Sequence, residues 1–190
     1  MLYQIFPVSK SEEALVYYEN YNHIFPDKYR DYFVHNKGDG KFLNYTTLAF
    51  CTQEAYNQNN IVKEDFLDCI TAPMPIFSVR FVNILNDYFV DEMKFIKCDI
   101  KCENKIFEYY IGKILKTKIL IDRDNSTYRQ LSDGSKIIDK PCYNINMNTD
   151  DFFIARDIDH YHPFFVTDKF IDLVKKNKLK MRFKEANWYL

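Results

Sequence analysis

The chain has 190 residues, of which 47% are hydrophobic and 28% are charged, so it can build a real core and is not a disordered chain. Its formal net charge of −1 argues against a nucleic-acid-binding protein, because neutralising phosphates requires an excess or a stripe of basic residues. The one basic run, Lys175 to Lys184, is expected to be a solvated helix end followed by the outward face of a strand.

The cysteines and the apolar runs indicate a soluble cytoplasmic protein. Five scattered cysteines without a small secreted scaffold are typical of reduced thiols. The first ten residues lack the basic and long apolar parts of a signal peptide. No apolar run approaches the roughly 18 residues of a membrane-spanning helix, so we expect no membrane partner.

The first 70 residues carry weak secondary-structure signals. Leu2 to Phe6 is predicted to be a strand, and Ser11 can begin a helix because two glutamates follow it. Asn20 to Gly40 is predicted to be mostly irregular, since it is polar and contains Pro26, Gly38 and Gly40. Phe42 to Phe50 is predicted to be a strand, and Lys63 to Ile70 a short helix.

The second half is better patterned. Ser78 is expected to cap a helix whose apolar stripe includes Phe81, Leu85 and Phe89. A second helix, from Asp168 to Asn177, is expected to be capped by Thr167. Turns are predicted at Asp122 to Ser126 and at Ser132 to Ser135. Strands are predicted in the runs Glu92–Ile100, Ile106–Ile114, Thr117–Ile121, Ile137–Ile138, Tyr143–Met147, Phe152–Arg156, Pro163–Val166 and Leu179–Phe183.

Strands and helices do not alternate regularly in this order, which favours an α+β fold over a doubly wound one. We therefore predict a mostly antiparallel sheet with a few packed helices. The length favours a single domain over residues 1–190. Within it, residues 1–72 are expected to form an irregular N-terminal subregion that packs on the α+β core of residues 73–190.

Two polar clusters are candidate catalytic sites. The loop Asp157 to His162 holds two aspartates and two histidines, but one loop rarely closes a metal site alone, so a solvated loop is favoured and no metal is expected. Cys142 could form a nucleophile pair with His160 or His162, although no local signature supports one.

No cofactor is expected either. The chain has four glycines and no phosphate-binding, dinucleotide-binding, nucleophile-elbow or zinc-protease motif. Adjacent acids such as Asp91 and Glu92 are expected to be surface residues. These features favour a binding protein over an enzyme.

From about Ala72 to Phe183, the series of short motifs resembles a family of immunity proteins from bacterial polymorphic toxin systems. The motifs are a helix opening, an aromatic strand, a strand ending in Asp, an apolar strand ending in Arg, a capped helix and a last strand with Phe. In this chain they are Pro75-Ile-Phe-Ser78-Val-Arg80-Phe81, Phe107-Glu-Tyr109-Tyr110-Ile111, Ile119-Leu-Ile-Asp122, Phe152-Phe-Ile-Ala-Arg156, Phe164-Phe-Val166-Thr167 with its helix, and Leu179 to Phe183.

The resemblance implies neutralisation of a cognate toxin domain by tight binding, without catalysis. Such an interface needs exposed aromatic anchors and a polar rim. The candidate anchors are the tyrosines of two Tyr-rich segments, Tyr17, Tyr18, Tyr21, Tyr29 and Tyr32. If the toxin were a nuclease, an acidic patch could enter its basic cleft; the candidates are Asp150, Asp151, Asp157 and Asp159.

Two other functions stay open at this point. One is a small metal-dependent hydrolase that uses the Asp157–His162 loop. The other is an adaptor that binds an endogenous partner. Gene neighbourhood separates it from immunity, because the absence of a toxin-like reading frame beside this one would count against immunity.

Overall fold

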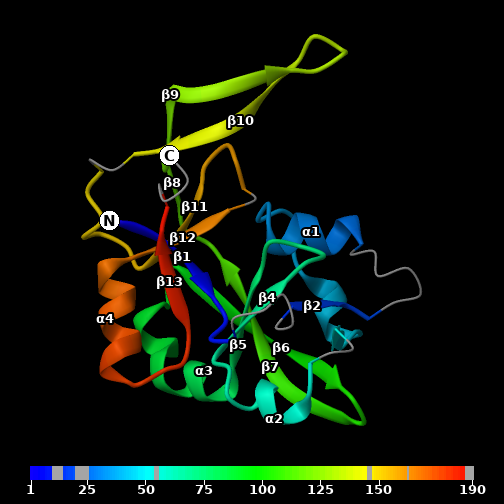
Figure 1. Ribbon diagram of the computed structural model, residues 1–190. Helices are drawn as coiled ribbons and strands as arrows, with labels where there is room; N and C mark the ends of the chain where they lie inside the picture. The colour runs from blue at the N-terminus through cyan, green and yellow to red at the C-terminus, as the bar shows by residue number, and fades with distance from the viewer. Residues whose placement is uncertain (10–14, 20–25, 54–55, 145–146, 162, 187–190) are drawn as a thin grey trace.

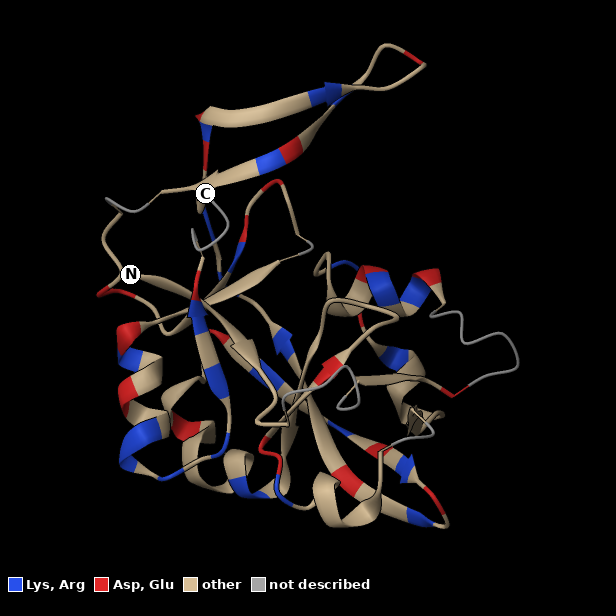
Figure 2. Ribbon diagram, viewed as in Figure 1, with Lys and Arg blue, Asp and Glu red and all other residues tan. Residues whose placement is uncertain are grey.

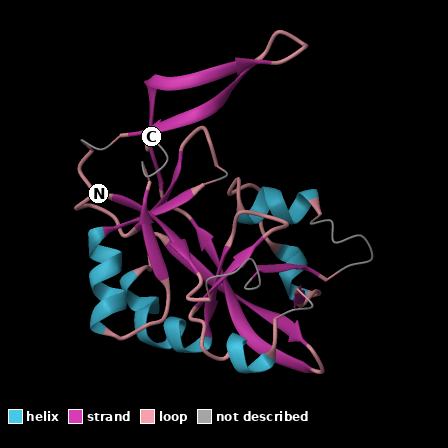
Figure 3. Ribbon diagram, in the orientation of Figure 1, coloured by secondary structure: helices cyan, strands magenta, loops and turns pink. Residues whose placement is uncertain are grey.

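The computed structural model of the chain describes residues 1–9, 15–19, 26–53, 56–144, 147–161 and 163–186. Two sheets and a separate hairpin make up the strands (Figure 1). The sheets are mostly antiparallel and helices pack beside them, which confirms the predicted α+β class. Figure 3 shows the helices at the edges of the strand-rich body.

The first sheet has five strands in the order β13-β1-β12-β11-β8. All of its pairs are antiparallel except the parallel pair of β11 with β8. Its strands come from distant parts of the chain: β1 (Leu2–Phe6), β8 (Thr117–Lys118), β11 (Ile154–Asp157), β12 (Phe164–Thr167) and β13 (Arg182–Glu185). The N-terminal strand therefore lies between two C-terminal strands.

The second sheet closes on itself in the order β2-β3-β6-β7-β5-β4. Buried side chains such as Val16, Phe50 and Ile111 fill its interior. The strands are β2 (Leu15–Tyr18), β3 (Leu48–Thr52), β4 (Phe66–Cys69), β5 (Pro75–Ser78), β6 (Met93–Cys102) and β7 (Lys105–Ile114). Residues 1–72 thus supply strands to both sheets, a larger contribution than their irregular sequence indicates.

The helices cover the apolar faces that the strands leave open. The C-terminal helix α4 (Asp168–Lys176) packs Phe170 and Val174 into a cluster that also contains Phe81 and Leu85 of α3 (Val79–Leu85). The remaining short helices are α1 (Asp27–Phe33), η2 (Lys41–Asn44), α2 (Gln58–Ile61) and η3 (Asn86–Tyr88).

The two predicted caps have different outcomes. The hydroxyl of Ser78 accepts a hydrogen bond from the Phe81 N–H at 3.1 Å, as expected of an N-cap. Thr167 does precede α4, but its hydroxyl donates to the carbonyl of Phe152 at 3.0 Å instead of capping the helix. Thr167 is buried, so its hydroxyl takes the partner that β11 brings close.

Several local predictions in the first half are wrong. Residues Lys63 to Ile70 contain strand β4 rather than a helix, because Phe66, Leu67 and Cys69 are all buried and show no alternation. The segment from Phe42 begins with η2, and the strand starts only at Leu48. Helix α1 lies inside the stretch predicted to be irregular, and the helix predicted at Ser11 falls mostly outside the described residues, with strand β2 starting at Leu15.

Gly112 shows how tightly the closed sheet packs on the shared core. A Cβ at this position would lie 2.5 Å from Met93 Sδ, 2.9 Å from Phe77 Cε2 and 3.1 Å from Pro75 Cγ. The backbone of Gly112 is not in the left-handed region, so the constraint comes from space and not from conformation.

We therefore expect Gly112→Ala to lower the free energy of unfolding by about 1–3 kcal/mol, because it overpacks three buried side chains. Urea denaturation followed by circular dichroism measures the change. Lys94→Ala on the neighbouring strand, where the side chain is exposed, should stay within about 0.5 kcal/mol of wild type. Equal effects of the two substitutions would contradict this account of the packing.

Candidate functional site

The hairpin of β9 (Ile121–Gln130) and β10 (Lys136–Tyr143) projects from the body of the molecule (Figure 1). Its two strands pair with each other and with no other strand in the described part of the chain. The predicted turn at Ser132 to Ser135 lies at its tip, where Gly134 adopts a φ of +85°. Both outer edges of the hairpin therefore face away from other strands.

The hairpin bends at an elbow. Lys140 pairs with Thr127 and Cys142 pairs with Asp122, so four residues of β9 lie opposite Pro141 alone. Proline has no N–H to give to the ladder, which suits a position where pairing is interrupted. The carbonyl and carboxylate of Asp122 bind the Ser126 hydroxyl at 2.6 Å and the Asn125 N–H at 3.1 Å, and these contacts hold the bulge in shape.

Beyond the elbow, residues Thr127 to Lys140 form what we call the arm. Three of its apolar side chains are exposed: Tyr128 by 46%, Leu131 by 36% and Ile137 by 37%. Ile138 is half-buried and packs against the cluster that contains Tyr143 and Phe165. Tyr128 pairs with Ile138, whereas Ile137 pairs with Arg129. Because neighbouring residues of a strand point to opposite faces, the arm carries apolar side chains on both faces.

The charges of the arm are mixed. It holds three basic residues, Arg129, Lys136 and Lys140, and two acidic residues, Asp133 and Asp139, which alternate along the ribbon (Figure 2). No single sign dominates, so the arm suits a protein surface better than a polyanion.

Asp157 fixes the root of the arm. It is fully buried, and one of its oxygens accepts the N–H groups of Leu120 and Ile121, each at 2.9 Å. The other oxygen accepts the N–H groups of Asp159 at 3.0 Å and His160 at 2.9 Å. Arg123 also donates to this second oxygen, at 3.4 Å. The prediction that Asp157 belongs to an exposed acidic patch is therefore wrong, because its carboxylate is buried and bonded within the protein.

The other acids of the predicted patch are exposed but face cations. Asp159, with 66% of its side chain exposed, pairs with Arg123 of β9. Asp151 pairs with Lys118, and Lys169 donates to the main-chain carbonyl of Asp150. The patch is thus partly neutralised by its own surroundings.

The tyrosines predicted as anchors mostly serve the core of the closed sheet. Tyr29 is buried and stacks on Phe42 with ring centroids 4.5 Å apart, so its prediction as an exposed anchor is wrong. Tyr32 is half-buried and holds Lys113 Nζ 3.4 Å above its ring. Tyr17 and Tyr18 are half-buried on β2, and burial raises the pKa of Tyr18 to about 12. Tyr21 lies outside the described residues.

The Asp157–His162 loop is not arranged as a metal site in the residues that the structure describes. Asp157 is committed to main-chain N–H groups, and His162 lies outside the described residues. Among the described side chains, no group of three or more His, Cys, Asp and Glu is placed to hold an ion. Burial also raises the pKa of Cys98 well above its ordinary value, which keeps that thiol protonated.

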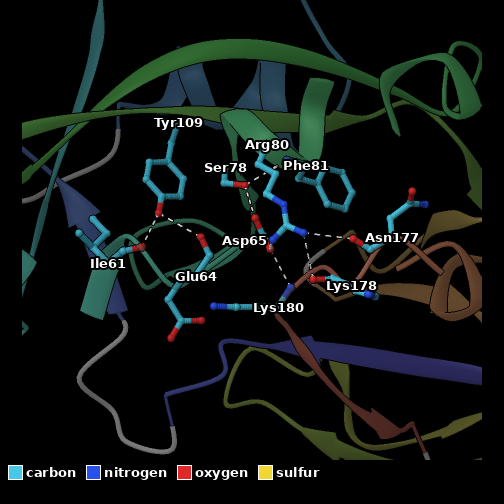
Figure 4. A network of polar contacts seen from close by, with 10 residues as sticks. All are labelled: Ile61, Glu64, Asp65, Ser78, Arg80, Phe81, Tyr109, Asn177, Lys178 and Lys180. Atoms are coloured by element: carbon cyan, nitrogen blue, oxygen red, sulfur yellow. Dashed lines mark hydrogen bonds and ion pairs between the residues drawn. The ribbon is translucent and has the colours of Figure 1, made fainter. Parts of the chain in front are cut away.

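A polar network beside a surface cleft joins the two sheets (Figure 4). At its centre, the buried Asp65 accepts hydrogen bonds from the Ser78 hydroxyl at 2.6 Å and the Lys180 N–H at 2.7 Å. Arg80 donates to Asp65 at 3.4 Å and to the carbonyls of Asn177 and Lys178, each at 3.2 Å. No pattern in the sequence predicts this network.

Other buried carboxylates make similar links. Glu92 accepts the N–H groups of Phe153 at 2.8 Å and Ile154 at 3.0 Å. The expectation that Asp91 and Glu92 are both surface acids is therefore wrong for Glu92, which is buried. A carboxylate in such a place is held by the main chain of a distant segment and is not free for acid–base chemistry.

We expect Asp157→Asn to lower the free energy of unfolding by about 3 kcal/mol, because an amide nitrogen would face main-chain N–H donors that the carboxylate now satisfies. Asp159→Asn, in the same loop but exposed, should cost at most about 1 kcal/mol. Chemical denaturation of both variants measures the difference. Equal effects would show that the buried carboxylate does not organise the root of the arm.

Comparison with known proteins leaves the family open. No protein-family model matches the sequence, and no curated protein matches it. No helix in the described ranges is long and apolar enough to cross a membrane.

Proposed function

We propose that the chain is a cytoplasmic immunity protein that neutralises a cognate bacterial toxin by stoichiometric binding. The observation that carries this proposal is the arm. Tyr128, Leu131 and Ile137 are exposed on an element that pairs with no other strand of the described chain. An isolated two-stranded hairpin is marginally stable in water, so a protruding one with apolar side chains is best explained by a partner that covers it.

The arrangement of the second half also supports the proposal. The resemblance to immunity proteins rests on a helix opening, an aromatic strand and a late helix with a final strand. These segments form β5 with α3, β7, and α4 with β13. They build the body from which the arm projects, and a rigid body with one protruding element is well suited to fill a partner's cleft.

The buried carboxylates also favour a binding function over an enzymatic one. Asp65, Glu92 and Asp157 accept main-chain N–H groups, so each has a structural task that explains its presence. None of them needs an enzymatic role to account for its burial. Binding is therefore a better account of the described residues than hydrolysis.

The test is a protection assay in which this chain is expressed with the toxin domain of a neighbouring reading frame. The wild-type chain should restore growth, and Tyr128→Ser with Ile137→Ser should abolish protection. Truncating an interface anchor costs about 2 kcal/mol or more, so the double variant should bind at least about 100-fold more weakly in calorimetry with the purified toxin domain.

The matched control is Ile84→Ser with Tyr88→Ser on α3 and η3, whose side chains are exposed by 37% and 50%. This variant should protect as wild type does. Failure of wild type to protect would reject immunity. Protection by wild type and by the arm variant alike would instead place the interface elsewhere.

A further inference from the structure

A cleft of about 310 Å³ opens beside the Asp65 network, and none of its lining residues belongs to the arm. Its walls come from the segment before β4, from the start of α3, from β7 and from the segment before β13. The hydroxyl of Tyr109 donates to the carbonyl of Ile61 at 2.7 Å and to that of Glu64 at 3.1 Å, which ties the β7 wall to the segment before β4 (Figure 4). The cleft is therefore built from segments that are held in place.

Two lysines line this cleft without a carboxylate partner. Lys63 and Lys180 are both exposed, and neither forms an ion pair in the part of the chain that the structure describes. The acid Glu108 also lines the cleft, but it pairs with Lys97 and accepts a hydrogen bond from the Tyr110 hydroxyl at 3.0 Å. Glu64 and Asp65 line the cleft as well, but both are buried and accept main-chain N–H groups, Glu64 those of Val8 and Ser9 and Asp65 that of Lys180. The two lysines are therefore exposed charges of the lining that no ion pair compensates in the described part of the chain.

Arg80 adds donors that are already oriented. A guanidinium has five N–H groups, and Arg80 uses three hydrogen bonds, one to Asp65 and two to carbonyls. Its side chain is 48% exposed at the cleft, so the remaining N–H groups can reach a ligand. A fixed guanidinium loses little freedom when it binds a carboxylate.

The lining favours a peptide carboxylate over a phosphate. Phosphate sites usually offer several free main-chain N–H groups. Here the N–H groups of Asp65, Ser78 and Lys180 are already bonded within the network. Apolar side chains of Val62, Val79 and Phe107 lie among the cations and suit a ligand with an apolar side chain next to its charge.

We infer that this cleft binds an extended acidic segment of a partner protein, with its carboxylates at Lys63, Arg80 and Lys180 and an apolar side chain against Val62, Val79 and Phe107. This site is separate from the arm and does not depend on immunity function. It gives the chain a second point of contact for a partner.

The test is calorimetry of the full chain with a blocked peptide of five alternating Glu and Phe residues at low salt. We expect saturable binding with a Kd below about 1 mM. Lys63→Gln with Lys180→Gln should weaken binding about tenfold, and added salt should weaken it further, since surface charges are screened. Glu108→Gln should strengthen it, because the substitution removes an exposed carboxylate from the lining of the cleft.

The matched control removes the same charge from the arm, by Lys136→Gln with Lys140→Gln, and should bind the peptide as wild type does. A peptide in which Gln replaces Glu should bind at least tenfold more weakly. Absence of saturable binding, equal loss in the two double variants, or full displacement of the peptide by inorganic phosphate at matched ionic strength would each overturn the inference. Toxin protection in the earlier assay is scored separately, so either proposal can fail alone.

Discussion

The structure depends on buried carboxylates that accept main-chain N–H groups from distant segments. In the closed sheet and beside it, Glu64 accepts the N–H groups of Val8 and Ser9, and Asp65 accepts the N–H group of Lys180. Glu92 accepts the N–H groups of Phe153 and Ile154. Asp157 accepts the N–H groups of Leu120 and Ile121. Removing a charge from water is costly unless such donors satisfy it. Each carboxylate is therefore stable only when its partner segment is in place. Together the four carboxylates join the closed sheet, the open sheet and the root of the arm.

The body formed in this way holds the arm in a protruding position. Asp157 holds the chain where it enters β9, and the bulge opposite Pro141 turns the hairpin outward. The arm carries Tyr128 and Ile137 on opposite faces. A flat partner would cover only one face of such a hairpin. A cleft that closes around it would cover both, which is the way a stoichiometric inhibitor blocks a toxin in our proposal.

The sequence predicted what local pattern controls. The α+β class, the helix that begins after Ser78 and the tip of the arm all follow from spacing, caps and turn residues. The prediction of a helix over Lys63 to Ile70 was wrong because burial hides the strand pattern there. Phe66 to Cys69 is buried on both faces and lacks the alternation typical of a strand. The run Asp122 to Ser126 predicted a turn and is instead the bulged elbow inside β9. Asp157 and Tyr29 were misplaced because composition does not reveal which polar side chains a fold encloses.

The most direct test of the central claim is hydrogen–deuterium exchange of this chain alone and in a one-to-one complex with the toxin domain that we propose as its partner. Binding through the arm predicts slower amide exchange in residues 127–140, whose strand edges are open in the free chain. Unchanged exchange in these residues, with protection confined to another surface, would contradict the account.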